Sequence, residues 1–167
     1  MKKTKIGIIG CGAISDAYYR GLSAFRFVEL AGVADMNLER AKVKAEEWNT
    51  RASSVNDLLA LDDIEIVLNL TIPAAHAAVD LQILQAGKNP YSEKPLGLNR
   101  EEGEKVLSLA AESGLRVGCA PDTVLGAGIQ TSRKLIDGGW IGEPLAATAF
   151  MMSRGVERWH PNPNFFY

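Results

Sequence analysis

A glycine-containing turn near the N-terminus has the residue types of a phosphate-binding loop. The turn consists of Gly10, Cys11, Gly12, Ala13, Ile14 and Ser15. Gly10 can adopt the positive φ of a tight turn, and Gly12 has no side chain to keep a pyrophosphate away from the backbone. A helix that begins here presents free N–H groups and the positive end of its dipole to that pyrophosphate. Ser15 occupies the position of the pattern's third glycine, where a small residue is tolerated because the position serves close packing of helix on strand.

A carboxylate follows the turn at the spacing expected for ribose recognition. Asp35 lies about 20 residues beyond the turn, at the end of the second predicted strand. Its carboxylate can accept hydrogen bonds from both ribose hydroxyls of NAD, whereas it would repel the 2′-phosphate of NADP. We therefore expect NAD, with NADP as the alternative because Arg40 could bind that phosphate. Two simpler interpretations stay open, namely a glycine-rich turn without a ligand and a solvated carboxylate at a strand end.

Two further polar stretches follow predicted strands. Residues 69–76 are Asn-Leu-Thr-Ile-Pro-Ala-Ala-His, and residues 92–96 are Ser-Glu-Lys-Pro-Leu. In an open parallel sheet, ligands bind outside the carboxyl ends of the strands, where both stretches would lie. Hydride removal from an alcohol needs the developing negative oxygen to be stabilised, and a fixed ammonium such as that of Lys94 can do this. The alternative is an exposed Lys94 that pairs with Glu93.

The elements that would position these motifs alternate between strand and helix over residues 1–119. Predicted strands are residues 6–9, 27–34, 52–54, 64–70, 90–93 and 115–119, and predicted helices are residues 13–25, 38–48, 56–60, 73–86 and 100–113. We expect Asn37 and Asn99 to cap two of the helices. Pro90 cannot donate a ladder hydrogen bond, so its strand is expected to start late. The alternation predicts the α/β class, a Rossmann-type doubly wound parallel sheet with helices on both faces.

Residues 120–167 follow a different pattern. We predict a helix at residues 124–137, stopped by Gly138 and Gly139, and then a strand at residues 145–152. This is the first helix and strand of an incomplete α+β second domain, so residues 1–119 and 120–167 are expected to be separate domains. The strand would be an exposed edge, which could pair with another copy of the chain.

Composition excludes several classes of protein. The chain has 167 residues and a formal net charge of −2, which leaves no basic face for nucleic acid or an anionic membrane. No apolar run approaches the roughly 20 residues of a membrane span or forms the roughly 7–15-residue core of an export signal. Cys11 and Cys119 belong to no disulfide or metal pattern, so we expect small packing roles, with a reactive thiol as the alternative. We therefore predict a cytoplasmic protein without metal, nucleic-acid or membrane partners.

Three motifs together resemble one known family. The turn at residues 10–15, the stretch at residues 69–76 and the triplet Glu93-Lys94-Pro95 are similar to motifs of the Gfo/Idh/MocA family. Members are NAD(P)-dependent oxidoreductases that act mostly on sugars and cyclitols. The resemblance continues through residues 136–144, which look like the family's entry into its second domain. That domain commonly forms a dimer interface, so the resemblance also implies a homo-oligomer.

The resemblance implies roles for individual residues. Backbone atoms of residues 10–14 would bind the pyrophosphate. The nicotinamide–ribose path would be lined by Leu70, Thr71, Ile72 and Pro73. His76 would lie near the cofactor at the start of a helix, with an ordinary polar helix residue as the alternative. Glu93 would hydrogen-bond a cofactor ribose, Lys94 would reach the oxygen on the reacting carbon, and the Lys94–Pro95 bond would be cis.

The general base is expected outside this segment. In the family, a histidine on the sheet of the second domain has that role, and His160 lies in an irregular Trp-His-Pro stretch that does not match its motif. We expect the 167-residue chain to bind NAD weakly and to be inactive alone.

Three functions of different classes follow from these features. The first is an oxidoreductase that transfers hydride between NAD(P) and a sugar-like or polyol CH–OH group. The second is a non-catalytic NAD(P)-binding sensor or regulatory module, and the third is a purely structural scaffold. Lys94 next to Glu93 favours the enzyme, since a sensor needs no group to stabilise an alkoxide.

Overall fold

The computed structural model describes residues 2–158 and residue 163. The chain divides into two compact units, Met1–Thr123 and Val124–Tyr167. All described strands lie in the first unit. The second unit contains a helix, an irregular segment and the 3-10 turn η3 (Val156–Arg158). His160, which does not match the family's general-base motif, is outside the described residues.

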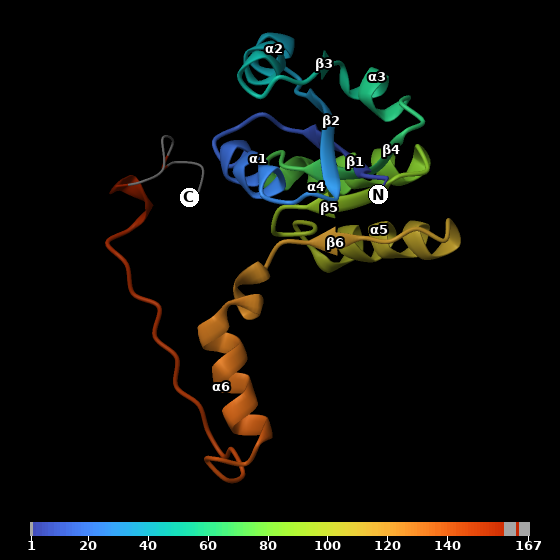
Figure 1. The fold of residues 1–167 in the computed structure, drawn as a ribbon. Coiled ribbons are helices and arrows are strands. Elements are labelled where there is room, and N and C mark those ends of the chain that lie inside the picture. The colour runs from blue at the N-terminus through green and yellow to red at the C-terminus, as the bar shows by residue number, and fades with distance from the viewer. Residues whose placement is uncertain (1, 159–162, 164–167) are drawn as a thin grey trace. The chain divides into compact units, whose positions relative to one another are not determined.

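The sheet has the strand order β3-β2-β1-β4-β5-β6, and each neighbouring pair is parallel (Figure 1). The strands are β1 (Thr4–Ile9), β2 (Val28–Ala34), β3 (Ala52–Ser53), β4 (Ile64–Asn69), β5 (Asn89–Ser92) and β6 (Gly118–Cys119). The chain builds outward from β1 to β3 and then crosses to β4 on the other side of β1. The strand order therefore reverses between β1 and β4, which confirms the predicted doubly wound α/β sheet.

Helices connect these strands in sequence. They are α1 (Ser15–Ser23), α2 (Leu38–Glu47), α3 (Val55–Leu59), the 3-10 turn η1 (Pro73–Ala75), α4 (His76–Gln85) and α5 (Arg100–Glu112). The Asn37 side chain accepts hydrogen bonds from backbone N–H groups in the first turn of α2, and Asn99 does the same for α5. Both predicted caps are confirmed, and each satisfies N–H groups that have no partner within the helix.

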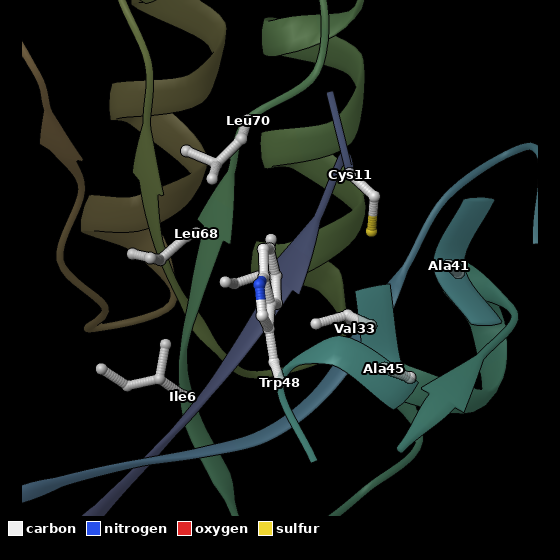
Figure 2. Packing of buried hydrophobic residues seen from close by; sticks show 9 residues of the cluster. Ile6, Cys11, Val33, Ala41, Ala45, Trp48, Leu68 and Leu70 are labelled. Carbon is white, nitrogen blue, oxygen red and sulfur yellow. The ribbon is translucent and has the colours of Figure 1, made fainter. Parts of the chain in front are cut away.

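On one face of the sheet, the core surrounds Trp48, the residue after α2. The side chains around it come mainly from the central strands and include Ile6, Val33, Leu68 and Leu70 (Figure 2). Ile8 belongs to the same cluster. The ring of Tyr19 from α1 stacks on the indole, with 4.7 Å between ring centroids. These contacts hold α1 and α2 against the sheet.

The opposite face is covered by α3 and α4. Ile9 of β1 and Val67 of β4 pack there with Leu58 of α3 and Ile83 of α4, all buried. Successive side chains of a strand point to opposite faces, so Ile8 and Ile9 enter different clusters. Helix α5 packs on α4 through small and aliphatic side chains: Ala77, Leu84, Val106 and Ala110.

Strand β5 corrects the expectation about Pro90. The strand begins at Asn89, before the proline, and pairs with β4 through Pro90 and Val67. The carbonyl of Ser92 accepts a hydrogen bond from the N–H of Ala120, just beyond β6. In a parallel sheet the backbone groups of alternate residues point to the same neighbouring strand, so those of Pro90 also point towards β6. Strand β6 begins one step later, opposite Tyr91, and thus the missing N–H of the proline costs no ladder hydrogen bond. Strand β6 is also shorter than predicted, because residues 115–117 leave α5 without pairing.

The second unit contains α6 (Ala127–Asp137), preceded by the 3-10 turn η2 (Asp122–Leu125). The predicted strand at residues 145–152 is wrong: these residues have no regular secondary structure. Their large apolar side chains are exposed, including those of Leu145, Phe150 and Met151. A strand needs a neighbour to satisfy its backbone, and no described segment pairs with this one. In the described parts of both units, no helix has the length and apolar character needed to cross a membrane.

Candidate functional site

Gly10 follows β1 and lies against the backbone of Leu70, the residue after β4. Its φ is +102°, a conformation that side-chain-bearing residues rarely adopt. A Cβ atom at this position would lie 2.6 Å from the carbonyl carbon and oxygen of Leu70. Only glycine therefore fits this position of the turn, where the carboxyl ends of β1 and β4 come close together.

Gly12 faces open space at the start of α1. A Cβ atom built on it would have no heavy atom within 4 Å. The buried hydroxyl of Ser15 donates a 2.6 Å hydrogen bond to the Gly12 carbonyl and so fixes the turn. No side chain caps helix α1 at Ile14, so no capping group covers the positive end of the helix dipole. The turn therefore offers backbone and space to an anion, as the pyrophosphate of a dinucleotide requires.

Asp35 joins the end of β2 to this turn. Its Oδ2 accepts a 2.9 Å hydrogen bond from the Cys11 N–H, and its Oδ1 accepts one of 2.8 Å from the Asn37 N–H. Nη1 of Arg40 lies 3.6 Å from Oδ2. The carboxylate is thus held beside the turn, with a guanidinium as its partner.

The two cysteines have the character of packing residues. Burial, together with the charge of Asp35, raises the pKa of the Cys11 thiol to about 11. Its sulfur lies 3.7 Å from the carbonyl oxygen of Ala34. Burial also raises the pKa of Cys119. The thiolate, which is the nucleophilic form, is disfavoured at both positions.

The loop after β4 contains four of the predicted residues. Leu70 is buried, Thr71 and Pro73 are partly buried, and Ile72 is exposed. The amide oxygen of Asn69 accepts hydrogen bonds from the hydroxyl and the N–H of Thr71, at 2.6 and 3.3 Å. His76 follows at the start of α4 and is buried.

The loop after β5 contains Glu93 and Lys94. Oε1 of Glu93 accepts a 2.8 Å hydrogen bond from the Tyr18 hydroxyl, and Oε2 accepts one of 3.0 Å from the backbone N–H of Lys94. The Lys94–Pro95 peptide bond is cis, as expected. Within the described residues, the exposed ammonium of Lys94 has no acidic partner. Glu93 therefore does not neutralise it.

Four strand ends thus meet at one edge of the sheet. The chain leaves β2, β1, β4 and β5, in that spatial order, at Asp35, Gly10, Leu70 and Glu93. Sequence reasoning missed Tyr18, which contacts Glu93 across 75 positions. It also missed Asp80, although a lone carboxylate within the apolar segment at residues 77–84 was a visible signal. Among the described residues, no group of His, Cys, Asp and Glu side chains could hold a metal ion.

The strand order, together with the glycine turn before the uncapped helix α1, defines a dinucleotide-binding Rossmann domain. A family model described as an oxidoreductase family with an NAD-binding Rossmann fold matches residues 4–120. The chain belongs to this family, the Gfo/Idh/MocA oxidoreductases, which confirms the resemblance noted from the motifs.

Curated and solved relatives agree with this assignment. Inositol 2-dehydrogenase of Gluconacetobacter diazotrophicus is 28% identical over 156 residues, which span 90% of this chain and 46% of the relative. A 3-ketoreductase from Actinomadura kijaniata, solved with TDP-benzene and NADP, has a TM-score of 0.77 and 28% identity, over 85% of this chain and 46% of that one. A dehydrogenase from Bordetella pertussis, solved with NADH and UDP-GlcNAcA, has a TM-score of 0.78 and 26% identity, over 83% and 40%. The chain therefore spans less than half the length of these relatives.

Proposed function

We propose that this chain is the NAD(P)-binding part of an oxidoreductase that transfers hydride between the nicotinamide ring and a CH–OH carbon of a sugar-like or polyol substrate. The carrying observation is that the open surface of Gly12, the carboxylate of Asp35 and the exposed ammonium of Lys94 all follow strands at the same sheet edge. That ammonium has no acidic partner among the side chains that the structure describes. In this proposal residues 1–119 are the NAD(P)-binding domain, and residues 120–167 begin a domain for substrate binding and oligomerisation.

The glycine turn and Asp35 bind the adenosine half of the cofactor. The N–H groups of Gly10 and Cys11 already donate to the Ala34 carbonyl and to Asp35. The backbone N–H groups of residues 12–14 therefore bind the pyrophosphate, because Gly12 leaves the approach open. Asp35 accepts hydrogen bonds from the ribose hydroxyls. NAD is favoured over NADP because this carboxylate repels a 2′-phosphate. Arg40, which could otherwise bind that phosphate, is paired with Asp35.

The loops after β4 and β5 bind the nicotinamide half. Residues 70–73 line the nicotinamide ribose, largely through backbone atoms, and Glu93 accepts a hydrogen bond from a ribose hydroxyl. NAD(P), when bound, supplies or accepts the hydride. Lys94 stabilises the negative charge that develops on the substrate oxygen, which a free ammonium can do more effectively than one paired with a carboxylate. This use of Lys94 favours an enzyme over a cofactor-binding sensor.

The substrate class and setting complete the proposal. The names of the relatives mention inositol and a nucleotide sugar, which favours a polyhydroxylated ring as substrate. Two free cysteines suit the reducing cytoplasm, where NAD(P) is present. The exposed apolar side chains of Leu145, Phe150 and Met151 favour a homo-oligomer.

Titration of the chain with NADH, followed by cofactor fluorescence, tests the proposal. Gly12→Val should weaken binding by at least about tenfold, because its side chain would occupy the pyrophosphate's space. Gly21→Val is a matched control, since Gly21 also has open space around its Cβ position but lies farther along α1. The proposal predicts wild-type affinity for Gly21→Val. Absence of both NADH and NADPH binding by the wild-type chain would refute it.

A further inference from the structure

The imidazole of His76 lies between the two loops that bind the nicotinamide half in the proposed function. The side chain is buried, with 1% of its surface exposed. Nδ1 lies 2.6 Å from the carbonyl oxygen of Pro95, and Nε2 lies 3.0 Å from the carbonyl oxygen of Thr71. Both neighbours are acceptors, so a neutral ring donates to one carbonyl and a protonated ring donates to both. Neither ring nitrogen points to free space.

These two carbonyls belong to segments that are adjacent to the proposed reaction centre. Thr71 is within the loop after β4, and Pro95 directly follows Lys94. The backbone carbonyl of His76 also accepts a 2.9 Å hydrogen bond from the Asn69 amide, whose oxygen in turn holds Thr71. The histidine therefore links the loops through its side chain and anchors one of them through its backbone.

A buried carboxylate supports the same loops one turn further along α4. Asp80 is fully buried and accepts hydrogen bonds from the Asn69 amide, at 2.8 Å, and from the Ser92 hydroxyl, at 2.5 Å. Asn69 and Ser92 are the last residues of β4 and β5, directly before the two loops. Every buried side-chain N or O atom among the described residues has a hydrogen-bond partner. The first turns of α4 thus fix where both loops begin.

We infer that His76 is a positioning residue, which sets the loop at residues 70–73 against the Lys94–Pro95 segment and thereby shapes the subsite for the nicotinamide half of the cofactor. It acts through the two carbonyls and not by touching the cofactor. The inference rests on the proposed function. Loss of the imidazole should loosen the nicotinamide subsite and spare the adenosine subsite, because Gly12 and Asp35 are held by contacts that do not involve His76.

Two ligands separate these subsites. NADH occupies both, whereas ADP ends at the pyrophosphate, lacks the nicotinamide ribose and ring, and relies mainly on the glycine turn and Asp35. Calorimetric titration of the 167-residue chain with each ligand gives the ratio of the two affinities. For His76→Ala the ratio of NADH affinity to ADP affinity should fall about tenfold, with ADP affinity within about twofold of wild type. His76→Gln keeps a donor and most of the volume, so it should recover part of the ratio.

The controls make a structural effect visible. Gln82→Ala changes an exposed side chain of α4 and should leave both affinities unchanged. ADP binding reports that a variant is folded, and His76→Gln provides the test if His76→Ala does not fold. The inference is overturned if both affinities fall in parallel, if neither changes, or if wild type binds the two ligands equally well. A wild-type chain that binds neither ligand instead refutes the proposed function itself.

Discussion

The Tyr18 hydroxyl donates a 2.8 Å hydrogen bond to Oε1 of Glu93, which joins α1 to the loop after β5. Helix α1 begins at the glycine turn, so this contact connects the two ends of the proposed cofactor site. Oε2 of Glu93 is held separately by the N–H of Lys94. The carboxylate that would receive a ribose hydroxyl is therefore oriented from two sides.

Tyr18→Phe should weaken NADH binding by about threefold to tenfold, because Glu93 loses one of the donors that orient it. Tyr19→Phe is the matched control: its hydroxyl contacts the Trp48 carbonyl at 3.4 Å, and its ring lies in the core. NADH fluorescence titration of both variants checks the prediction. Equal affinities for the two variants would show that the contact between Tyr18 and Glu93 has no part in binding.

Asp35→Asn should shift cofactor preference from NADH towards NADPH. The amide oxygen keeps an acceptor for one of the two neighbouring N–H groups. The change removes the charge that repels a 2′-phosphate and releases Arg40 to bind that phosphate. We expect the ratio of NADPH to NADH affinity to rise at least about tenfold. Asp63→Asn, at the opposite edge of the sheet, should leave the ratio unchanged. An unchanged ratio in Asp35→Asn would remove Asp35 from the ribose site.

Lys94→Ala should separate binding from turnover. In the isolated chain its NADH affinity should stay within about twofold of wild type, because Lys94 acts on the substrate oxygen. In a protein that also carries a substrate domain, kcat should fall at least about 100-fold. Lys105→Ala on α5 is the control, since that exposed lysine pairs with Glu101. Wild-type turnover by Lys94→Ala would contradict the role of the ammonium.

Asp80 should make the stability of the chain depend on pH. Burial raises the pKa of this carboxyl, an effect that hydrogen bonds from Ser92 and Asn69 only partly offset. The native state therefore holds the proton more tightly than the unfolded state. The resulting stabilisation is complete below the ordinary pKa of an aspartate, about 3.9, and is lost as pH rises through the native value.

Urea unfolding of wild type and Asp80→Asn between pH 4 and pH 7 measures this dependence. Wild type should gain stability relative to Asp80→Asn as the pH falls. Asp63→Asn is the control: a hydrogen bond from Lys5 lowers the pKa of the exposed Asp63, so this group titrates below the measured pH range and the curve should run nearly parallel to that of wild type. Parallel curves for wild type and Asp80→Asn would contradict the prediction.

Local sequence patterns predicted the parts of the fold that depend on neighbouring residues. The glycine turn, the caps at Asn37 and Asn99 and the apolar strand before Asn69 each show their chemistry within a few positions. The contact between Tyr18 and Glu93 could not be predicted this way, because it forms only after the sheet brings α1 and β5 together. The same holds for the two carbonyls around His76.

The wrong prediction of a strand at residues 145–152 has a related cause. Its apolar composition suits a strand, but strand formation depends on a partner that the composition does not report. Pro90 shows the converse. Proline is unfavourable in strands in general, but the nitrogen of Pro90 points towards β6 at a level where β6 has not begun, so no ladder hydrogen bond is lost.

Amide chemical-shift mapping of the chain with NADH tests the central claim most directly. The account predicts that the amides that shift belong to residues 10–15, 35–37, 70–73 and 93–96, all beyond the carboxyl ends of adjacent strands. ADP should shift the first two groups and leave the last two largely unchanged. Shifts confined to other surfaces, or none at saturating NADH, would contradict the assignment of this edge as the cofactor site.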